Sequence, residues 1–493
     1  MILAIDQGTT GTTSLVFDLE GELIGRAQRE FAQHFPQPGW VEHDLGEIAA
    51  VTDAVVGAAL ADAGARPGDL IALGITNQRE TVCVWDPTTG EPLHRAIVWQ
   101  DRRTAARCDA LRAAGHEAQV RAITGLTLDP YFSASKIEWL LTHVDGLRAR
   151  AERGRAVFGT VDAWLIHRLS GEFITDPTNA SRTLLYDIHR GAWSEELLTL
   201  FGAIDPAWLP AVGPSAGLLA HTRPACCHGH AVPIAGVAGD QQAALFGQAC
   251  LDPGMAKNTY GTGSFLLLNA GTRAPGSTPG LLTTVASGIG QRVTYALEAS
   301  IFVTGAAVQW LRDGLGIIAA AAETEALSAG LSGNDGVYFV PALTGLGSPH
   351  WDPYARGTIV GLTRGTGRAH LARATLEAIA YESADAVSAM AAAGGAPLEQ
   401  LRADGGATAN AWLMQFQADI LGVPVLLPAI TETTALGAAS LAGVGVGLWT
   451  LSGVAERWQE RRRFEPTMGE DERASLLAGW GRAVARARDW VER

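Results

Sequence analysis

Cysteine is scarce in this sequence, which has five cysteines among 493 residues. Two of them, Cys226 and Cys227, are adjacent, and this spacing fits neither a zinc site nor a disulfide framework. Reduced thiols are typical of proteins in a reducing compartment. We therefore expect a cytoplasmic location, with no structural disulfides.

Positive charge is also in short supply, because the formal net charge is −14 and the sequence pI is about 5.3. Such a chain repels the phosphates of nucleic acids, so we expect no nucleic-acid partner. A polyphosphate ligand would instead need local positive features. Backbone amides, helix N-termini, a divalent cation or a few placed arginines can supply them.

Long hydrophobic runs are missing. The longest apolar stretch, near residues 316–322, stops at Glu323 and is far shorter than the roughly 20 residues that span a membrane. The apolar run at residues 1–5 lacks basic flanking residues and meets Asp6, unlike a signal peptide. We expect no membrane insertion.

The chain is too long for one compact core, so at least two domains are expected. Strand-like and helix-like segments alternate in the first half, which predicts an α/β domain. A similar order restarts near residue 233, and residues 301–311 are predicted to be helical. We place the domains at residues 1–248 and 249–493, with an active-site cleft between them.

A first Gly- and Thr-rich segment, DQGTTGT, covers residues 6–12. A tight turn of this kind exposes backbone N–H groups and hydroxyls that can hold phosphate oxygens. Asp6, at the end of the preceding strand, is placed to support a hydrated Mg²⁺ ion. The alternative is an ordinary hairpin turn in which Asp6 only caps the backbone.

A second segment, GVAGDQQAALFG at residues 236–247, predicts a strand followed by a helix that starts at Asp240. A helix N-terminus favours the ionised carboxylate, which could act as general base toward a substrate hydroxyl. The alternative is an N-capping aspartate, and the two roles are compatible.

Two further Gly-rich turns lie at residues 258–265 (NTYGTGSF) and 404–410 (DGGATAN). One such turn is a weak signal. Three of them, together with two aspartates at strand ends, predict a phosphoryl-transfer site.

The segment NQRET at residues 77–81 places Arg79 beside Glu80. This pair offers donors and acceptors that suit vicinal hydroxyls. The alternative is a solvated surface ion pair. Trp99, Tyr131 and Phe265, each taken singly, are more typical of a core than of a substrate pocket.

Together these motifs resemble the FGGY family of carbohydrate kinases, within the actin-like and hexokinase-like superfamily, and in particular its glycerol-phosphorylating branch. The resemblance covers nearly the whole chain. Its longest matching stretches are residues 39–44, 75–81, 97–100, 129–140, 238–248 and 354–377.

The resemblance implies two actin-like (ribonuclease H-like) α/β domains, with mixed sheets flanked by helices, that close on MgATP and glycerol. The implied product is sn-glycerol 3-phosphate, with Asp240 as catalytic base and Asp6 at the Mg²⁺ ion. The implied glycerol-binding residues are Arg79, Glu80, Trp99, Tyr131, Asp240, Gln241 and Phe265. The implied nucleotide-binding residues are Thr9, Thr10, Gly11, Thr13, Thr262, Gly305, Gln309, Gly406 and Asn410. The resemblance also implies a homodimer or homotetramer.

The sequence departs from the family pattern in two places. Thr13 replaces an arginine that is common in relatives, where it is a cationic neighbour of the nucleotide phosphates, so the strength of nucleotide binding stays an open question. Residues 228–233 (HGHAVP) carry alanine where an arginine binds fructose 1,6-bisphosphate in some relatives, so we expect weak or no inhibition by that sugar.

Three other functions compete with this interpretation. A related kinase would act on a larger substrate, such as a pentulose or gluconate. An actin-like or chaperone-like ATPase would hydrolyse ATP without an acceptor. A sensor scaffold would keep the fold without the chemistry, although Asp6 and Asp240 argue against it.

Overall fold

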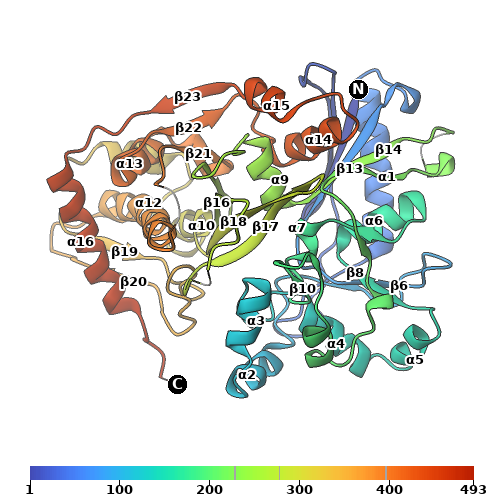
Figure 1. The fold of residues 1–493 in the computed structure, drawn as a ribbon. Coiled ribbons are helices and arrows are strands. Elements are labelled where there is room, and N and C mark those ends of the chain that lie inside the picture. Colours follow the sequence, from blue (N-terminus) through green and yellow to red (C-terminus); the bar gives the residue numbers. More distant parts are fainter. Residues whose placement is uncertain (227–228, 277, 395–396, 493) are drawn as a thin grey trace.

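The computed structural model contains two lobes side by side (Figure 1). It describes residues 1–226, 229–276, 278–394 and 397–492. The first half of the chain, blue to green, forms most of the right-hand lobe, and the second half forms most of the left-hand lobe. No helix in the described residues is both long enough and apolar enough to cross a membrane.

Thirteen strands within the described residues form one continuous mixed sheet that runs through both lobes. Their order is β23-β22-β21-β15-β16-β18-β17-β13-β14-β5-β1-β2-β3. The strands from the first half are β1 (Ile2–Gln7), β2 (Gly11–Phe17), β3 (Leu23–Glu30), β5 (Ala72–Asn77), β13 (Ala216–His221) and β14 (Pro233–Gly239). Those from the second half are β15 (Ala256–Tyr260), β16 (Ser264–Gly271), β17 (Leu282–Ile289), β18 (Arg292–Ile301), β21 (Leu401–Asp404), β22 (Val425–Pro428) and β23 (Glu460–Phe464).

The two halves of this sheet meet through a single bridge, between Ala216 in β13 and Ile289 in β17. The mixed α/β class predicted from the sequence is therefore present, with the sheets of the two halves joined at their edges. The sheet is mixed because β1 pairs antiparallel with β2 and parallel with β5.

Helices cover both faces of the sheet. The longer ones, of ten residues or more, are α1 (Leu45–Asp62), α4 (Ala134–His143), α6 (Val161–Ser170), α12 (Arg368–Ala392), α13 (Ala411–Leu421), α14 (Thr433–Gly445) and α16 (Glu470–Ala487). The shorter ones are α2 (Ala105–Ala113), α3 (Glu117–Thr124), α5 (Leu147–Glu152), α7 (Pro177–Ala180), α8 (Glu195–Leu200), α9 (Asp240–Gly247), α10 (Gly305–Gln309), α11 (Glu323–Ala329) and α15 (Leu451–Arg457).

In the part of the chain that the structure describes, five small strand pairs lie outside the main sheet. They are β4 (Glu42–His43) with β7 (Ala96–Ile97), β6 (Cys83–Trp85) with β8 (Val157–Gly159), β9 (Ile174–Thr175) with β12 (Ala211–Val212), β10 (Tyr186–Asp187) with β11 (Ala192–Trp193), and β19 (Tyr338–Val340) with β20 (Thr358–Val360).

Strand β1 shows why its residues form a central strand. Leu3 and Ile5 pack into one apolar core with α1, while Ile2 and Ala4 pack into a second core with α14. A strand buried on both faces needs an uninterrupted apolar run rather than an alternating pattern. The apolar run stops at Asp6 and Gln7, the last two residues of the strand. The carboxyl end of β1 therefore carries polar side chains.

Helix α14 comes late in the sequence but packs on strands of the first half. Its residues Ala438 and Ala442 share a core with Ile2 and Ala4, and it lies beside the N-terminal strands in Figure 1. A Cβ on Gly437 would clash with the carbonyl oxygen of Ala243, so glycine lets α14 approach the backbone of α9. This packing fixes the position of α9.

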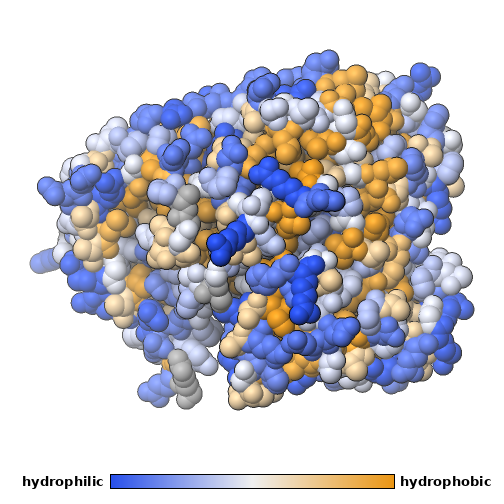
Figure 2. Space-filling model, viewed as in Figure 1, coloured by the Kyte–Doolittle hydropathy of each residue, from blue (hydrophilic) through white to orange (hydrophobic). Residues whose placement is uncertain are grey.

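The surface in the same view is hydrophilic around its outline, and apolar residues gather toward the middle and the right (Figure 2). Much of this apolar area lies where α9, α14 and the central strands meet in Figure 1. Apolar residues therefore reach this face of the molecule in the region where the lobes join.

The helix predicted at residues 301–311 is partly wrong. Strand β18 continues through Ile301, and α10 covers only Gly305–Gln309 before a wide helical turn at Trp310–Gly314. A short buried strand has the same continuous apolar pattern as a buried helix segment, so periodicity alone does not separate them.

Candidate active site

Asp240 is the first residue of α9, and its side chain retains 29% exposure at the end of β14. Gly239 is the N-cap, so the capping alternative is wrong, although Asp240 Oδ1 accepts a hydrogen bond from the Gln241 amide at 2.7 Å. Arg79 Nε lies 3.2 Å from Asp240 Oδ1. The carboxylate therefore faces a partly open space beside a buried cation.

The surroundings of Asp240 shift the pKa of its carboxyl in the direction opposite to the one expected at a helix N-terminus. Burial raises the pKa of this carboxyl above its ordinary value, although Arg79 and Lys257 act to lower it. Desolvation outweighs both the helix N-terminus and the nearby cations. A raised carboxyl pKa suits a group that must accept a proton during turnover.

Arg79 and Glu80 are not a solvated surface pair, so that alternative is wrong. Their side chains are 2% and 1% exposed. Arg79 binds Glu298 through two nitrogens, with Nη1–Oε2 at 2.5 Å and Nη2–Oε1 at 3.1 Å. Arg182 Nε donates to Glu80 Oε1 at 2.5 Å, and Arg182 Nη2 donates to Glu298 Oε1 at 3.0 Å.

Glu298 and Arg182 are site residues that sequence reasoning missed. Both side chains are completely buried. Burial alone would raise the pKa of Glu298, but Arg182 and Arg79 lower it to about 2. A lone glutamate inside the apolar strand β18 is a signal that could have found Glu298, because buried charges are almost always paired. No such signal marks Arg182, which follows the short helix α7.

The backbone of Glu80 is unusual, because its φ is +63°. A non-glycine residue with positive φ is uncommon and costs about 1 kcal/mol or more, so surrounding contacts must hold it there. Its carbonyl accepts a hydrogen bond from Ser133 Oγ at 2.9 Å, and its side chain is held by Arg182. The conformation aims the Glu80 carboxylate into the arginine network.

The three predicted aromatic residues gather around the same network. Trp99 and Tyr131 form an edge-to-face pair with ring centroids 5.4 Å apart. Arg182 lies 5.6 Å from the Tyr131 ring centroid, and Arg79 lies 5.9 Å from that of Phe265. These side chains can line a small apolar-walled space around buried charges.

The first Gly- and Thr-rich turn connects to this space. Trp99 Nε1 donates to Thr9 Oγ1 at 2.9 Å, while Thr10 is exposed. Gly11 and Thr13 lie on β2, where Thr13 pairs with Asp6 on β1. The structure therefore brings the predicted phosphate turn next to the predicted substrate wall.

Asp6 fits a role near a divalent cation. Burial, together with the negative charges of Asp240 and Glu432, raises the pKa of Asp6 to about 7. A cation placed between these carboxylates would relieve their repulsion. Within the described residues, no group of three or more His, Cys, Asp or Glu side chains could itself hold a metal, so a Mg²⁺ ion here would keep most of its water or phosphate ligands.

The predicted nucleotide-binding residues of the second half line one cavity of about 400 Å³. All five are in its wall: Thr262, Gly305, Gln309, Gly406 and Asn410. A Cβ on Gly305 would lie 2.7 Å from the Gly261 carbonyl oxygen, so glycine allows these two walls to meet. The cavity is large enough for a bound small molecule.

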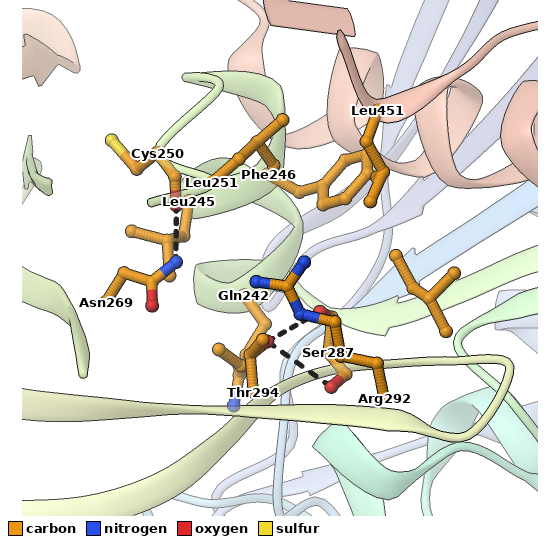
Figure 3. Close-up of a pocket in the computed structure, with 12 residues that line it drawn as sticks. Gln242, Leu245, Phe246, Cys250, Leu251, Asn269, Ser287, Arg292, Thr294 and Leu451 are labelled. Atoms are coloured by element: carbon orange, nitrogen blue, oxygen red, sulfur yellow. Dashed lines mark hydrogen bonds between the residues drawn. The ribbon is translucent and has the colours of Figure 1, made fainter. Parts of the chain in front are cut away.

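A second cavity, of about 70 Å³, lies beside α9 (Figure 3). None of the predicted site residues lines it. Gln242 connects it to the charge network, because Gln242 Oε1 accepts a hydrogen bond from Arg79 Nη1 at 3.2 Å. Arg292 is exposed and points into this cavity.

One prediction cannot be placed in full. It concerns the sugar-bisphosphate loop at residues 228–233, and His228, like Cys227, is outside the described residues.

Comparison with known proteins gives the family. The model of the FGGY carbohydrate kinase N-terminal domain matches residues 1–247, and that of the C-terminal domain matches residues 256–446. A protein named glycerol kinase from Deinococcus radiodurans is 56% identical, over 100% of this chain and 98% of the relative. Another from Aromatoleum aromaticum is 58% identical, over 99% of each chain.

A solved structure supports the same assignment. The crystal structure of Plasmodium falciparum glycerol kinase with ADP superposes with a TM-score of 0.93 at 36% identity, covering 99% of this chain and 98% of that chain. The predicted fold and family are thus confirmed: this chain belongs to the FGGY family of carbohydrate kinases.

Proposed function

We propose that this protein transfers the terminal phosphoryl group of ATP to glycerol, forming sn-glycerol 3-phosphate and ADP in glycerol catabolism. The observation that carries the proposal is the full-length identity of 56–58% to relatives named glycerol kinase. The buried charge network beside Asp240 offers chemistry that suits such a substrate.

Glycerol lies between the apolar walls Trp99 and Phe265 in this proposal. Its hydroxyls are bound by Arg79, Glu80, Tyr131, Asp240 and Gln241. Arg79 has five N–H donors, and four are accounted for by contacts with Gln242, Asp240 and the two oxygens of Glu298. One Nη2 hydrogen is left for a substrate hydroxyl.

Asp240 takes the proton of the attacking terminal hydroxyl. Phosphoryl transfer depends mainly on in-line positioning and on neutralising charge at the transferring group. Mg²⁺, when bound with ATP, supplies part of that neutralisation. Asp6 would hold the hydrated ion, and Thr9, Thr10, Gly11, Thr13 and Thr262 would present donors to the phosphates.

We further propose that residues 1–248 form the domain that binds substrate and phosphates, and residues 249–493 the domain that binds the nucleotide through Gly305, Gln309, Gly406 and Asn410. Closure of the domains would exclude water, which competes as an acceptor. We also propose that the protein is cytoplasmic and that it forms a homodimer or homotetramer.

An ADP-coupled assay with glycerol, dihydroxyacetone, xylulose and gluconate tests the function. We expect brisk ADP release only when glycerol or a close analogue is present. Equal ADP release without any acceptor would identify an ATPase instead. Faster turnover with xylulose or gluconate than with glycerol would identify a kinase for a larger substrate.

Asp6→Asn is expected to raise the Mg²⁺ concentration needed for half-maximal rate by about 10–100-fold, because outer-shell partners of a metal contribute on this scale. The KM for glycerol should stay near the wild-type value, since Asp6 does not contact the polyol. Magnesium titrations at saturating ATP measure the effect. An unchanged magnesium requirement would remove Asp6 from the ion site.

A further inference from the structure

Lysine is almost absent from this chain, which has two lysines among its 37 Lys and Arg residues. Both of them, Lys136 and Lys257, have an exposure of 0%. Lysine is ordinarily a surface residue that is almost never fully buried unless it is paired. Within the described residues, neither ammonium group has a carboxylate partner at ion-pair distance, and both donate to uncharged oxygens.

Lys136 lies on α4, beneath the aromatic wall. Its Nζ donates to the backbone carbonyl of Tyr131 at 3.0 Å and to that of Trp99 at 3.4 Å. These two residues come from separate loops, and both are placed against glycerol in the proposed function. The ammonium group therefore ties one aromatic wall residue to the other.

Lys257 lies on β15 and links a second pair of pocket residues, Gln241 and Phe265. Its Nζ donates to Gln241 Oε1 at 2.5 Å, to Thr259 Oγ1 at 2.9 Å and to the backbone carbonyl of Phe265 at 3.2 Å. Gln241 and Phe265 lie on different elements, α9 and β16. Both are again proposed contacts of glycerol.

We propose that Lys136 and Lys257 are positioning residues. Their ammonium groups hold four polyol-contacting residues in fixed positions relative to one another. This inference rests on the proposed function, because it takes Trp99, Tyr131, Gln241 and Phe265 as the polyol pocket. An ammonium group carries three donors in a compact tetrahedral arrangement, which can converge on two or three oxygens from different segments. The planar guanidinium fork of arginine does not match this geometry.

The cost of keeping these charges buried supports a functional reason for them. Burial lowers the pKa of Lys136 to about 8, while Asp101 and Glu80 act to raise it. Burial likewise lowers the pKa of Lys257 to about 8, against the opposing effect of Asp404 and Asp240. A site with no role in ligand binding would be more stable with a neutral side chain.

Kinetics of Lys136→Met and Lys257→Met test the inference. Each variant should raise the KM for glycerol about tenfold or more, since a lost hydrogen bond to a charged group is worth about that factor, while the KM for ATP stays within about twofold. Arg292→Met is the control, because Arg292 is an exposed cation in the separate cavity of Figure 3. If both lysine variants keep the wild-type KM for glycerol, or lose ATP affinity equally, the inference is overturned.

If a variant does not fold, a measurement on the wild-type protein can still test the inference. Protein labelled with ¹³C at lysine Cε gives two side-chain signals, because the chain has two lysines. Glycerol alone should shift both signals, and the absence of a shift in either would contradict the inference. If wild-type protein does not phosphorylate glycerol at all, the proposed function fails instead, and the coupled assay shows this independently.

Discussion

Asp240→Asn is expected to lower turnover by about 10²–10⁴-fold, the usual contribution of a general base. The amide keeps the size of the carboxylate but cannot accept the hydroxyl proton. Glycerol binding should stay measurable, because Arg79, Glu80 and the aromatic walls remain. Turnover from the ADP-coupled assay, together with calorimetric glycerol binding, measures the two effects separately.

Asp44→Asn is the matched control for this variant. Asp44 also stands at the start of a helix, where its side chain accepts hydrogen bonds from the amides of Gly46 and Glu47 at 2.8 and 3.0 Å. Asparagine caps helices about as well as aspartate, so this control should keep full turnover. Near-normal turnover in Asp240→Asn would sink the assignment of Asp240 as the base.

Glu298→Gln is expected to destabilise the protein by about 3–5 kcal/mol, the scale found when one partner of a buried ion pair is removed. Glu298 binds both Arg79 and Arg182, so its loss leaves two buried guanidinium groups short of an anion. The midpoint of urea unfolding should fall. The KM for glycerol should also rise, because Arg79 can rotate toward Asp240 and Glu80.

Glu377→Gln separates the two effects. Glu377 is buried on α12 and binds Arg373 at 2.7 Å, so its replacement also breaks a buried pair. This control should lose stability but keep the wild-type KM for glycerol. If Glu298→Gln behaves in the same way, the arginine network supports the fold without taking part in substrate binding.

The chemistry-bearing positions could be predicted from the sequence because each lies where a strand ends. The apolar runs of β1 and β14 stop at Asp6 and at Gly239, which places polar groups at the edge of the sheet. The Gly-rich turns that line the cavity of about 400 Å³ were found for a similar reason. One such turn is a weak signal, so it was the combination of three turns with two aspartates that marked these segments.

The partners of those positions could not be predicted in the same way. Lys257 lies 16 residues from Gln241, and Arg79 lies 219 residues from Glu298. Nothing in the local pattern around Arg182 distinguishes it from a solvated arginine, because its burial depends on segments far away in the sequence. The same holds for the pKa of Asp240, which the helix start acts to lower and the surrounding packing raises.

The sequence by itself determined the fold class, the Gly-rich turns and the two aspartates at strand ends, because these depend on local apolar runs and local backbone freedom. The tertiary structure alone decided that Arg79 and Glu80 are buried in a shared charge network, that α14 packs on the first-half strands, and that two lysines are enclosed beside the site. The physical reason is that burial and charge pairing depend on which distant segments meet, and a linear pattern does not specify that.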